Sequence, residues 1–132
     1  MRYLVAYVVT MIVMLAIDLL WLAVLAKSLY RESIGHLMAE NANLQAAAVF
    51  YLIYVGGLVL YGVAPHAAEP GVWKAAGSAA VFGFIAYATY DLTNLATLRD
   101  WPVRIVIIDL AWGAFISAIA AAAGKFAFDR AA

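Results

Sequence analysis

The sequence predicts an all-α fold, a four-helix transmembrane bundle with both chain termini on the same side of the membrane. The 132 residues are 68% hydrophobic and only 12% charged, whereas soluble domains average about 25% charged residues. The apolar residues are gathered into four runs, each near the 20 residues that cross a hydrocarbon core of roughly 30 Å. The length suggests one domain, so we expect residues 1–132 to form a single integral membrane domain surrounded by the lipid bilayer.

The four runs place the expected spans at residues 3–26, 46–64, 75–98 and 104–124. Backbone groups in hydrocarbon must be satisfied within their own segment, so each span is expected to be a helix. The first run is longer than the roughly 7–15 apolar residues of a signal peptide, and it contains an aspartate. We therefore interpret it as a retained span rather than a cleaved leader.

Charged and turn-forming residues separate the runs. Residues 27–43 form a polar loop, and residues 65–71 contain two prolines and a glycine that would break a helix. Residues 99–102 form a tight turn ending in Pro102, which suits the start of the next helix. From Lys125 onward we expect a polar tail. These connections support the count of four spans.

Two interpretations of the first loop stay open. Tyr30, Ile34, Leu37 and Met38 fall on one helical face, which is typical of a short amphipathic helix lying in the headgroup plane. An ordinary polar connector fits the composition equally well.

The positive charges do not settle the orientation. Four lysines or arginines fall on each side of the expected bundle, so the positive-inside rule is tied. A weak signal decided by other features explains the tie, and insertion in both orientations as an antiparallel dimer explains it too. The side of the termini has Arg2, Lys74, Lys125 and Arg130, and the other side has Lys27, Arg31, Arg99 and Arg104.

Apart from Arg104 at the edge of the fourth run, three aspartates are the only charged residues in the first, third and fourth runs: Asp18, Asp91 and Asp109. A carboxylate at the centre of a membrane helix costs roughly 2.5–3.5 kcal/mol on insertion scales. At 1.5 Å per residue, Asp18 and Asp91 lie roughly 10–12 Å before the ends of their spans, and Asp109 lies within roughly 10 Å of the start of its own. Because successive spans alternate in direction, all three are expected at a similar depth, nearer the side of the 27–43 loop.

Aromatic and polar residues accompany the aspartates at that depth. An Asp-x-x-Trp string occurs at residues 18–21 and again at 109–112. Tyr and Trp donate hydrogen bonds to carboxylates while packing against apolar groups. Like-charge repulsion and desolvation lead us to expect at least one neutral carboxyl. The predicted ligand-binding residues are Asp18, Trp21, Tyr51, Tyr54, Tyr87, Tyr90, Asp91, Asn94, Asp109 and Trp112.

No catalytic or cofactor motif stands out. Glu32, His36 and Glu40 are spaced so that a helix would align them as metal ligands, but a solvated charged face has the same spacing. The net charge is zero with His neutral, so there is no basic footprint for nucleic acid. We therefore expect no cofactor and no nucleic-acid partner.

The residue strings resemble a known group. The 18–21 string, the Tyr30–Leu37 loop and the Thr89–Thr97 segment are similar to those of a bacterial family of small four-helix membrane proteins that carries only a domain-of-unknown-function label. The most specific part is residues 90–97, followed by Trp101-Pro102 and residues 109–113. The resemblance implies a multi-pass protein of the bacterial cytoplasmic (inner) membrane, and it implies no activity.

Three functions compete. The first is a binding or transport protein whose acidic and aromatic pocket holds a proton, a cation or a small cationic ligand. The second is a membrane-embedded enzyme that acts on lipids or isoprenoids, with the aspartates as acids, bases or metal ligands. The third is an accessory subunit whose aspartates hold helices together. We favour the first, with a homodimer because four helices enclose only a thin pathway.

Overall fold

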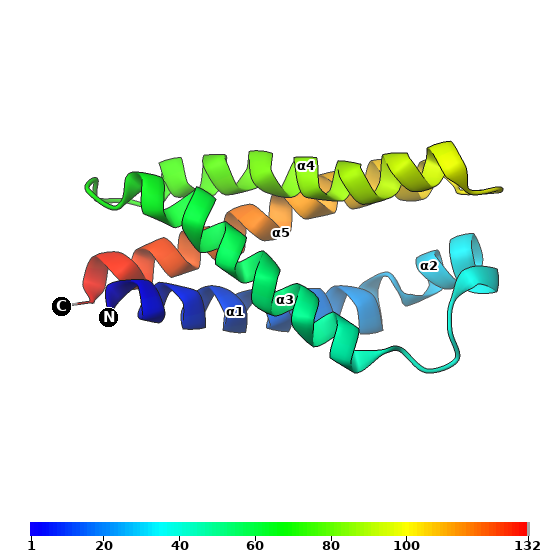
Figure 1. Ribbon diagram of the computed structural model, residues 1–132, viewed down its shortest axis with the longest axis horizontal. Helices are drawn as coiled ribbons and strands as arrows, with labels where there is room; N and C mark the ends of the chain where they lie inside the picture. Colours follow the sequence, from blue (N-terminus) through cyan, green and yellow to red (C-terminus); the bar gives the residue numbers. More distant parts are fainter. Residues whose placement is uncertain (132) are drawn as a thin grey trace.

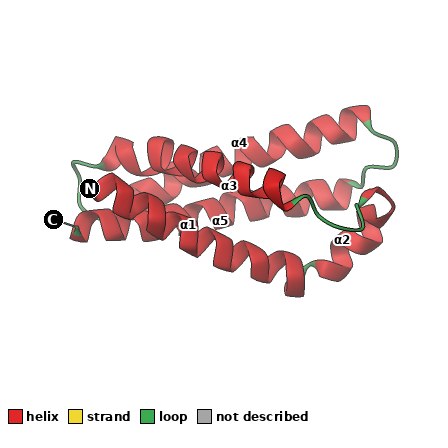
Figure 2. Cartoon of the chain, turned by 60° about the horizontal axis from the view of Figure 1, so that its bottom comes forward, coloured by secondary structure: helices red, strands yellow, loops and turns green. Residues whose placement is uncertain are grey.

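The computed structural model describes residues 1–131, and within that range the chain is helical and contains no strand. Figure 2 shows helices over most of the chain, with the connecting loops toward the two ends of the molecule. The all-α prediction is confirmed. The four long helices are α1 (Arg2–Leu20), α3 (Leu44–Leu58), α4 (Trp73–Thr97) and α5 (Val103–Arg130).

Two of the long helices end in π-helical turns. α1 continues into η1 (Trp21–Leu25), and α3 continues into η3 (Val59–Val63) and the 3-10 turn η4 (Ala64–His66). Turns of π-helix are rare and often occur at functional sites. Trp21, a predicted site residue, is the first residue of η1.

The loop after η1 contains a short helix. α2 (Lys27–Ile34) is followed by the 3-10 turn η2 (Gly35–Leu37), and an irregular stretch leads to α3. Of the two interpretations of this loop, the structure has the short helix, and its position in the headgroup plane stays a prediction. Tyr30 and Ile34 pack against a small buried cluster of Trp101, Ile105 and Val106, so that α2 lies against the start of α5.

Three of the long helices, α1, α4 and α5, lie roughly along one another, and α3 crosses them (Figure 1). α4 and α5 run antiparallel and pack closely, α1 lies along α5, and α3 crosses them obliquely (Figure 1). α3 itself contacts α1, whereas η3, which continues it, makes most of the contacts with α4. The first half of α3 thus diverges from α4. Figure 1 shows both chain ends at one end of the molecule, and α2 at the other.

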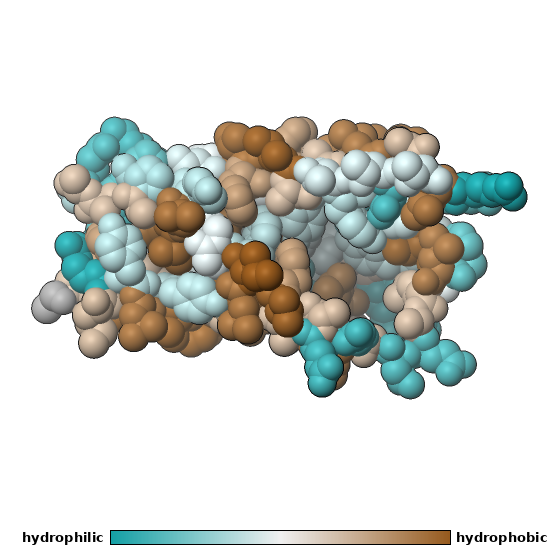
Figure 3. Space-filling model, viewed as in Figure 1, coloured by the Kyte–Doolittle hydropathy of each residue, from teal (hydrophilic) through white to brown (hydrophobic). Residues whose placement is uncertain are grey.

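Three helical segments are long and apolar enough to cross a membrane: Arg2–Leu25, Leu44–His66 and Val103–Arg130. α4 has 25 residues, enough in length, but its glycines, hydroxyl residues and Asp91 lower its hydropathy. Hydrophilic side chains gather at the two ends of the molecule and apolar ones between them (Figure 3). The chain is therefore suited to a lipid environment.

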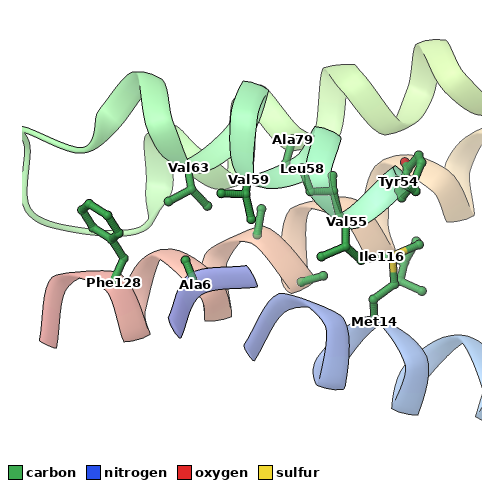
Figure 4. Close-up of a cluster of buried hydrophobic side chains, with 12 residues drawn as sticks. Ala6, Met14, Tyr54, Val55, Leu58, Val59, Val63, Ala79, Ile116 and Phe128 are labelled. Atoms are coloured by element: carbon green, nitrogen blue, oxygen red, sulfur yellow. The ribbon is translucent and has the colours of Figure 1, made fainter. Parts of the chain in front are cut away.

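The core lies where the crossing helices meet. Met14, Val55, Leu58 and Ile116 are fully buried and belong to one cluster drawn from α1, α3 and α5, with contributions from η3 and α4 (Figure 4). Small residues let the helices approach. A Cβ atom on Gly83 would collide with the carbonyl oxygen of Gly113 and with Ser117, as expected for close helix packing in membranes.

The expectation of a polar tail from Lys125 is wrong, because α5 continues to Arg130. Lys125 is fully buried, and its Nζ donates to the carbonyl oxygen of Glu69 (2.6 Å) and to Asp129 Oδ1 (2.5 Å). Gly71 N donates to the other oxygen of Asp129 (3.0 Å). Lysine is a good helix former, and because α5 continues, Asp129 lies one turn on from Lys125 and can accept from its ammonium.

Candidate functional site

A cavity of about 530 Å³ occupies the half of the molecule next to α2. Its walls come from α1, η1, α2, α3, α4 and α5, together with the stretch before α3. Figure 3 shows the molecule hollowed on this face, to the right of where α3 crosses. The cavity exists because the first half of α3 diverges from α4.

Asp18 lies at this cavity and is held by two donors from other helices. Tyr51 Oη, on α3, donates to Asp18 Oδ2, and Trp112 Nε1, on α5, donates to Asp18 Oδ1 (3.2 Å). The residue is only 5% exposed. Buried polar groups need hydrogen-bond partners, and these two contacts supply one to each oxygen of Asp18.

Asp109 is held in a related way. Tyr30 Oη, on α2, donates to Asp109 Oδ1, and Trp21 Nε1 donates to the same Tyr30 oxygen (3.2 Å). Burial, followed by the hydrogen bond to Asp109, raises the pKa of Tyr30, so its phenol remains a donor at neutral pH. Asp109 is also 5% exposed.

The two Asp-x-x-Trp strings exchange partners across the bundle. Trp112, from the second string, binds Asp18 of the first, and Trp21 reaches Asp109 through Tyr30. The two indole rings stack on each other, with centroids 4.2 Å apart and planes 12° apart. The stack joins the two carboxylate networks into one wall of the cavity.

Asp91 differs from the other two aspartates. It is fully buried, and neither of its carboxylate oxygens has a hydrogen-bond partner among residues 1–131. It is adjacent to Asp109 and to Trp101, whose buried Nε1 also lacks an acceptor. A buried polar group without a partner costs about 1–3 kcal/mol. Asp91 is therefore the least satisfied group near the cavity.

Seven of the ten predicted site residues line the cavity: Asp18, Trp21, Tyr51, Tyr87, Tyr90, Asp109 and Trp112. Tyr54 lines a neighbouring cavity of about 310 Å³, and its hydroxyl hydrogen-bonds with Ser117 Oγ (2.7 Å). Asp91 lies behind Asp109, and Asn94 lines neither cavity. The structure thus brings Asp18 and Asp109 to one cavity and leaves Asp91 outside its lining.

Several lining residues are missing from the sequence-based set. Lys27, Tyr30 and Arg31 come from α2, and Phe50 comes from α3. Helical rise predicts that the acids lie near the side of the 27–43 loop, so a tyrosine in that loop is within reach of them. Its position facing Asp109 depends on how α2 folds back.

The alternative of a metal site in the first loop is not supported by the geometry. Glu32 lies in α2, His36 lies in η2, and Glu40 lies beyond both, so that no single helix aligns them. Among residues 1–131, no three His, Asp or Glu side chains converge to form a metal site. The two carboxylates that line the cavity, Asp18 and Asp109, therefore do not belong to a three-ligand cluster within the described part of the chain.

Long apolar helices are typical of an α-helical membrane protein. The chain belongs to the DUF2177 family of predicted membrane proteins, which it matches over residues 3–126. The resemblance to a membrane family of unknown function is thereby confirmed. No curated protein and no solved structure matches the chain, so its function has to be argued from the cavity.

Proposed function

We propose that this protein is a multi-pass membrane protein of four spans whose acidic and aromatic cavity binds a proton, a cation or a small cationic ligand. In this proposal α4 spans the membrane together with the three more apolar helical segments, since it packs along α5 over most of its length. Both termini lie on one side of the membrane, and the family resemblance suggests the bacterial inner membrane. Translocation of the bound species through a homodimer is the fuller form of the proposal.

The observation that carries the proposal is the pairing of two buried carboxylates with aromatic walls. Asp18 and Asp109 line the same cavity, each held by a phenol, and a stacked pair of indoles lies between their networks. A cation near such carboxylates and ring faces gains both charge attraction and cation–π attraction. Ionisable residues inside a membrane are default candidates for a functional site.

Asp91 favours a binding role over a purely structural one. Polar residues that hold membrane helices together do so through hydrogen bonds across the interface, yet both oxygens of Asp91 lack a partner within residues 1–131. Like charges this close disfavour double ionisation, so one of Asp91 and Asp109 is expected to be protonated. Binding a cation at Asp109 would then favour release of that proton.

Ethylammonium is a suitable probe for cation binding. Its titration into the purified protein in detergent should change tryptophan fluorescence, because Trp21 and Trp112 line the cavity. Asp18→Asn and Asp109→Asn should each abolish the saturable change. Asp100→Asn is the matched control, since Asp100 is exposed and has a φ of 58° that Asn tolerates well. Unchanged binding in both cavity variants would refute the proposal.

Proton coupling has its own measurement. Protein reconstituted in liposomes should release or move protons when ethylammonium is added, and Asp91→Asn should abolish that signal. If the aspartates only hold helices together, Asn can replace them and the proton signal will be the same in the variant and the parent protein.

A further inference from the structure

Two bases accompany the two acids in the cavity lining. Lys27 and Arg31 line it beside Asp18 and Asp109, and neither base forms an ion pair among residues 1–131. Both bases lie on α2, whereas the two acids come from α1 and α5. The cavity therefore carries positive charge on one element and negative charge on two others, and its formal charges cancel.

This charge arrangement suits a zwitterion better than a simple ion. A plain cation would be attracted by Asp18 and Asp109 but repelled by Lys27 and Arg31, and a plain anion would meet the opposite pattern. A molecule with a phosphate and an ammonium can satisfy both pairs. Oδ2 of Asp109 also has no donor among residues 1–131, since Tyr30 binds Oδ1, so an ammonium N–H would find an acceptor there.

The cavity continues toward the lipid-facing surface between α3 and α4. The neighbouring cavity of about 310 Å³ shares Phe50, Tyr87 and Tyr90 with the main one. Phe50 is 44% exposed, Tyr90 is 53% exposed, and the apolar residues around them on α3 are exposed too. An apolar passage that opens on an apolar face leads to the bilayer and is lined as acyl chains require.

We infer that the cavity takes the head group of a zwitterionic membrane lipid that carries a phosphate and a primary ammonium, with its acyl chains leaving sideways between α3 and α4. The ammonium binds at Asp18 and Asp109, and the phosphate binds at Lys27 and Arg31. The volume of about 530 Å³ lies within the roughly 300–1,000 Å³ of small-molecule sites. This inference rests on the proposed function and specifies its ligand.

The test compares lipids of equal chain length and different head groups. The full chain in nanodiscs of equimolar phosphatidylethanolamine, phosphatidylcholine and phosphatidylglycerol is released into native mass spectrometry, and the bound lipids are counted. Phosphatidylethanolamine should be enriched roughly tenfold over phosphatidylglycerol, the effect of about one charge-assisted hydrogen bond. Phosphatidylcholine should be less enriched, because its quaternary ammonium has no N–H to donate.

Variants assign the two ends of the head group. Asp109→Asn should remove the preference for phosphatidylethanolamine while phospholipid is still retained. Lys27→Gln combined with Arg31→Gln should weaken the binding of all three lipids. Lys74→Gln is the matched control at the opposite end of the molecule and should change neither. Circular dichroism checks that each variant keeps its helical content.

Three outcomes would overturn the inference. Equal binding of phosphatidylethanolamine and phosphatidylglycerol by the parent protein would exclude recognition of the ammonium. Equal binding of phosphatidylcholine would exclude a primary ammonium as the ligand group. Displacement of the lipid by equimolar soluble phosphoethanolamine would point to a water-soluble ligand. If ethylammonium binds but no lipid preference appears, only this inference fails; if ethylammonium does not bind, the proposed function fails first.

Discussion

The two ends of the molecule treat their charges differently. At the end with the termini, Lys125 is fully buried and donates to both Glu69 and Asp129, and Arg2 donates to the carbonyl oxygen of Phe128 (3.1 Å). At the end with α2, Asp91 is buried without a partner among residues 1–131, and Lys27 and Arg31 form no ion pair there.

Packing follows the same division. Near the termini, η3 packs against α4 and the 67–72 loop is tied to α5 through Lys125 and Asp129. Near α2, the diverging first half of α3 leaves a cavity. The buried ammonium of Lys125 finds its acceptors within the chain and stabilises the fold, whereas Lys27 and Arg31 line the cavity without an ion pair among residues 1–131. The comparison therefore separates the structural basic residues from those of the candidate site.

The largest expected effect on stability is at the end with the termini. Asp129→Ala leaves the buried Lys125 ammonium with one acceptor fewer and should lower the free energy of unfolding by about 2–3 kcal/mol. Unfolding in detergent followed by circular dichroism measures it. Glu69→Ala is the control, because only the backbone oxygen of Glu69 binds Lys125, and it should cause no measurable loss. Equal stability of the two variants would mean that Lys125 does not need Asp129.

A second prediction tests the helix contact that joins the two ends. Gly83→Ala should destabilise the protein by about 1–2 kcal/mol, since its Cβ would collide with Gly113 and Ser117. Gly77→Ala is the matched control on the same helix, with no atom within 4 Å of the added Cβ. It should be neutral or slightly stabilising, because Ala favours helix over Gly. The same unfolding assay would contradict the tight contact if Gly83→Ala were also neutral.

A third prediction concerns the end with α2, where the cavity lies. Trp112→Phe removes the hydrogen bond to Asp18 and weakens the stack on Trp21, which should cost about 1 kcal/mol. It should also remove the exciton signal that two indoles 4.2 Å apart give in circular dichroism. Trp73→Phe is the control, since Trp73 is 86% exposed, and it should keep that signal. A signal that survives Trp112→Phe would show that the indoles do not stack.

The smallest effect is expected at the exposed ion pair of Lys74 and Glu69, at the end with the termini. A hydrogen bond from Lys74, together with its positive charge, lowers the pKa of Glu69. Because the folded pKa is lowered, the small stabilisation is present above the ordinary glutamate pKa and is lost as pH falls through the lowered value. An NMR titration of the Glu69 carboxyl should show this lowered midpoint, and Lys74→Gln should move it back up. A midpoint that Lys74→Gln leaves unchanged would contradict the pairing.

The sequence supported much of the fold because hydrophobic length and helix geometry act locally. The positions of all four long helices follow from their apolar runs, and helical rise alone places Asp18 and Asp109 at a shared depth. The burial of Lys125 near the end of α5 does not follow, since it depends on the Glu69 carbonyl oxygen that a separate loop brings to it.

What the sequence determined by itself was an all-helical membrane chain with aspartates at one level and a repeated Asp-x-x-Trp string. Only the tertiary structure decided which donor each carboxylate receives, that Tyr30 belongs to the site, and that Asp91 stays outside the cavity lining. The physical reason is that helical periodicity fixes depth and facing within a segment. The partners of a buried charge and the space beside it depend on how separate helices cross.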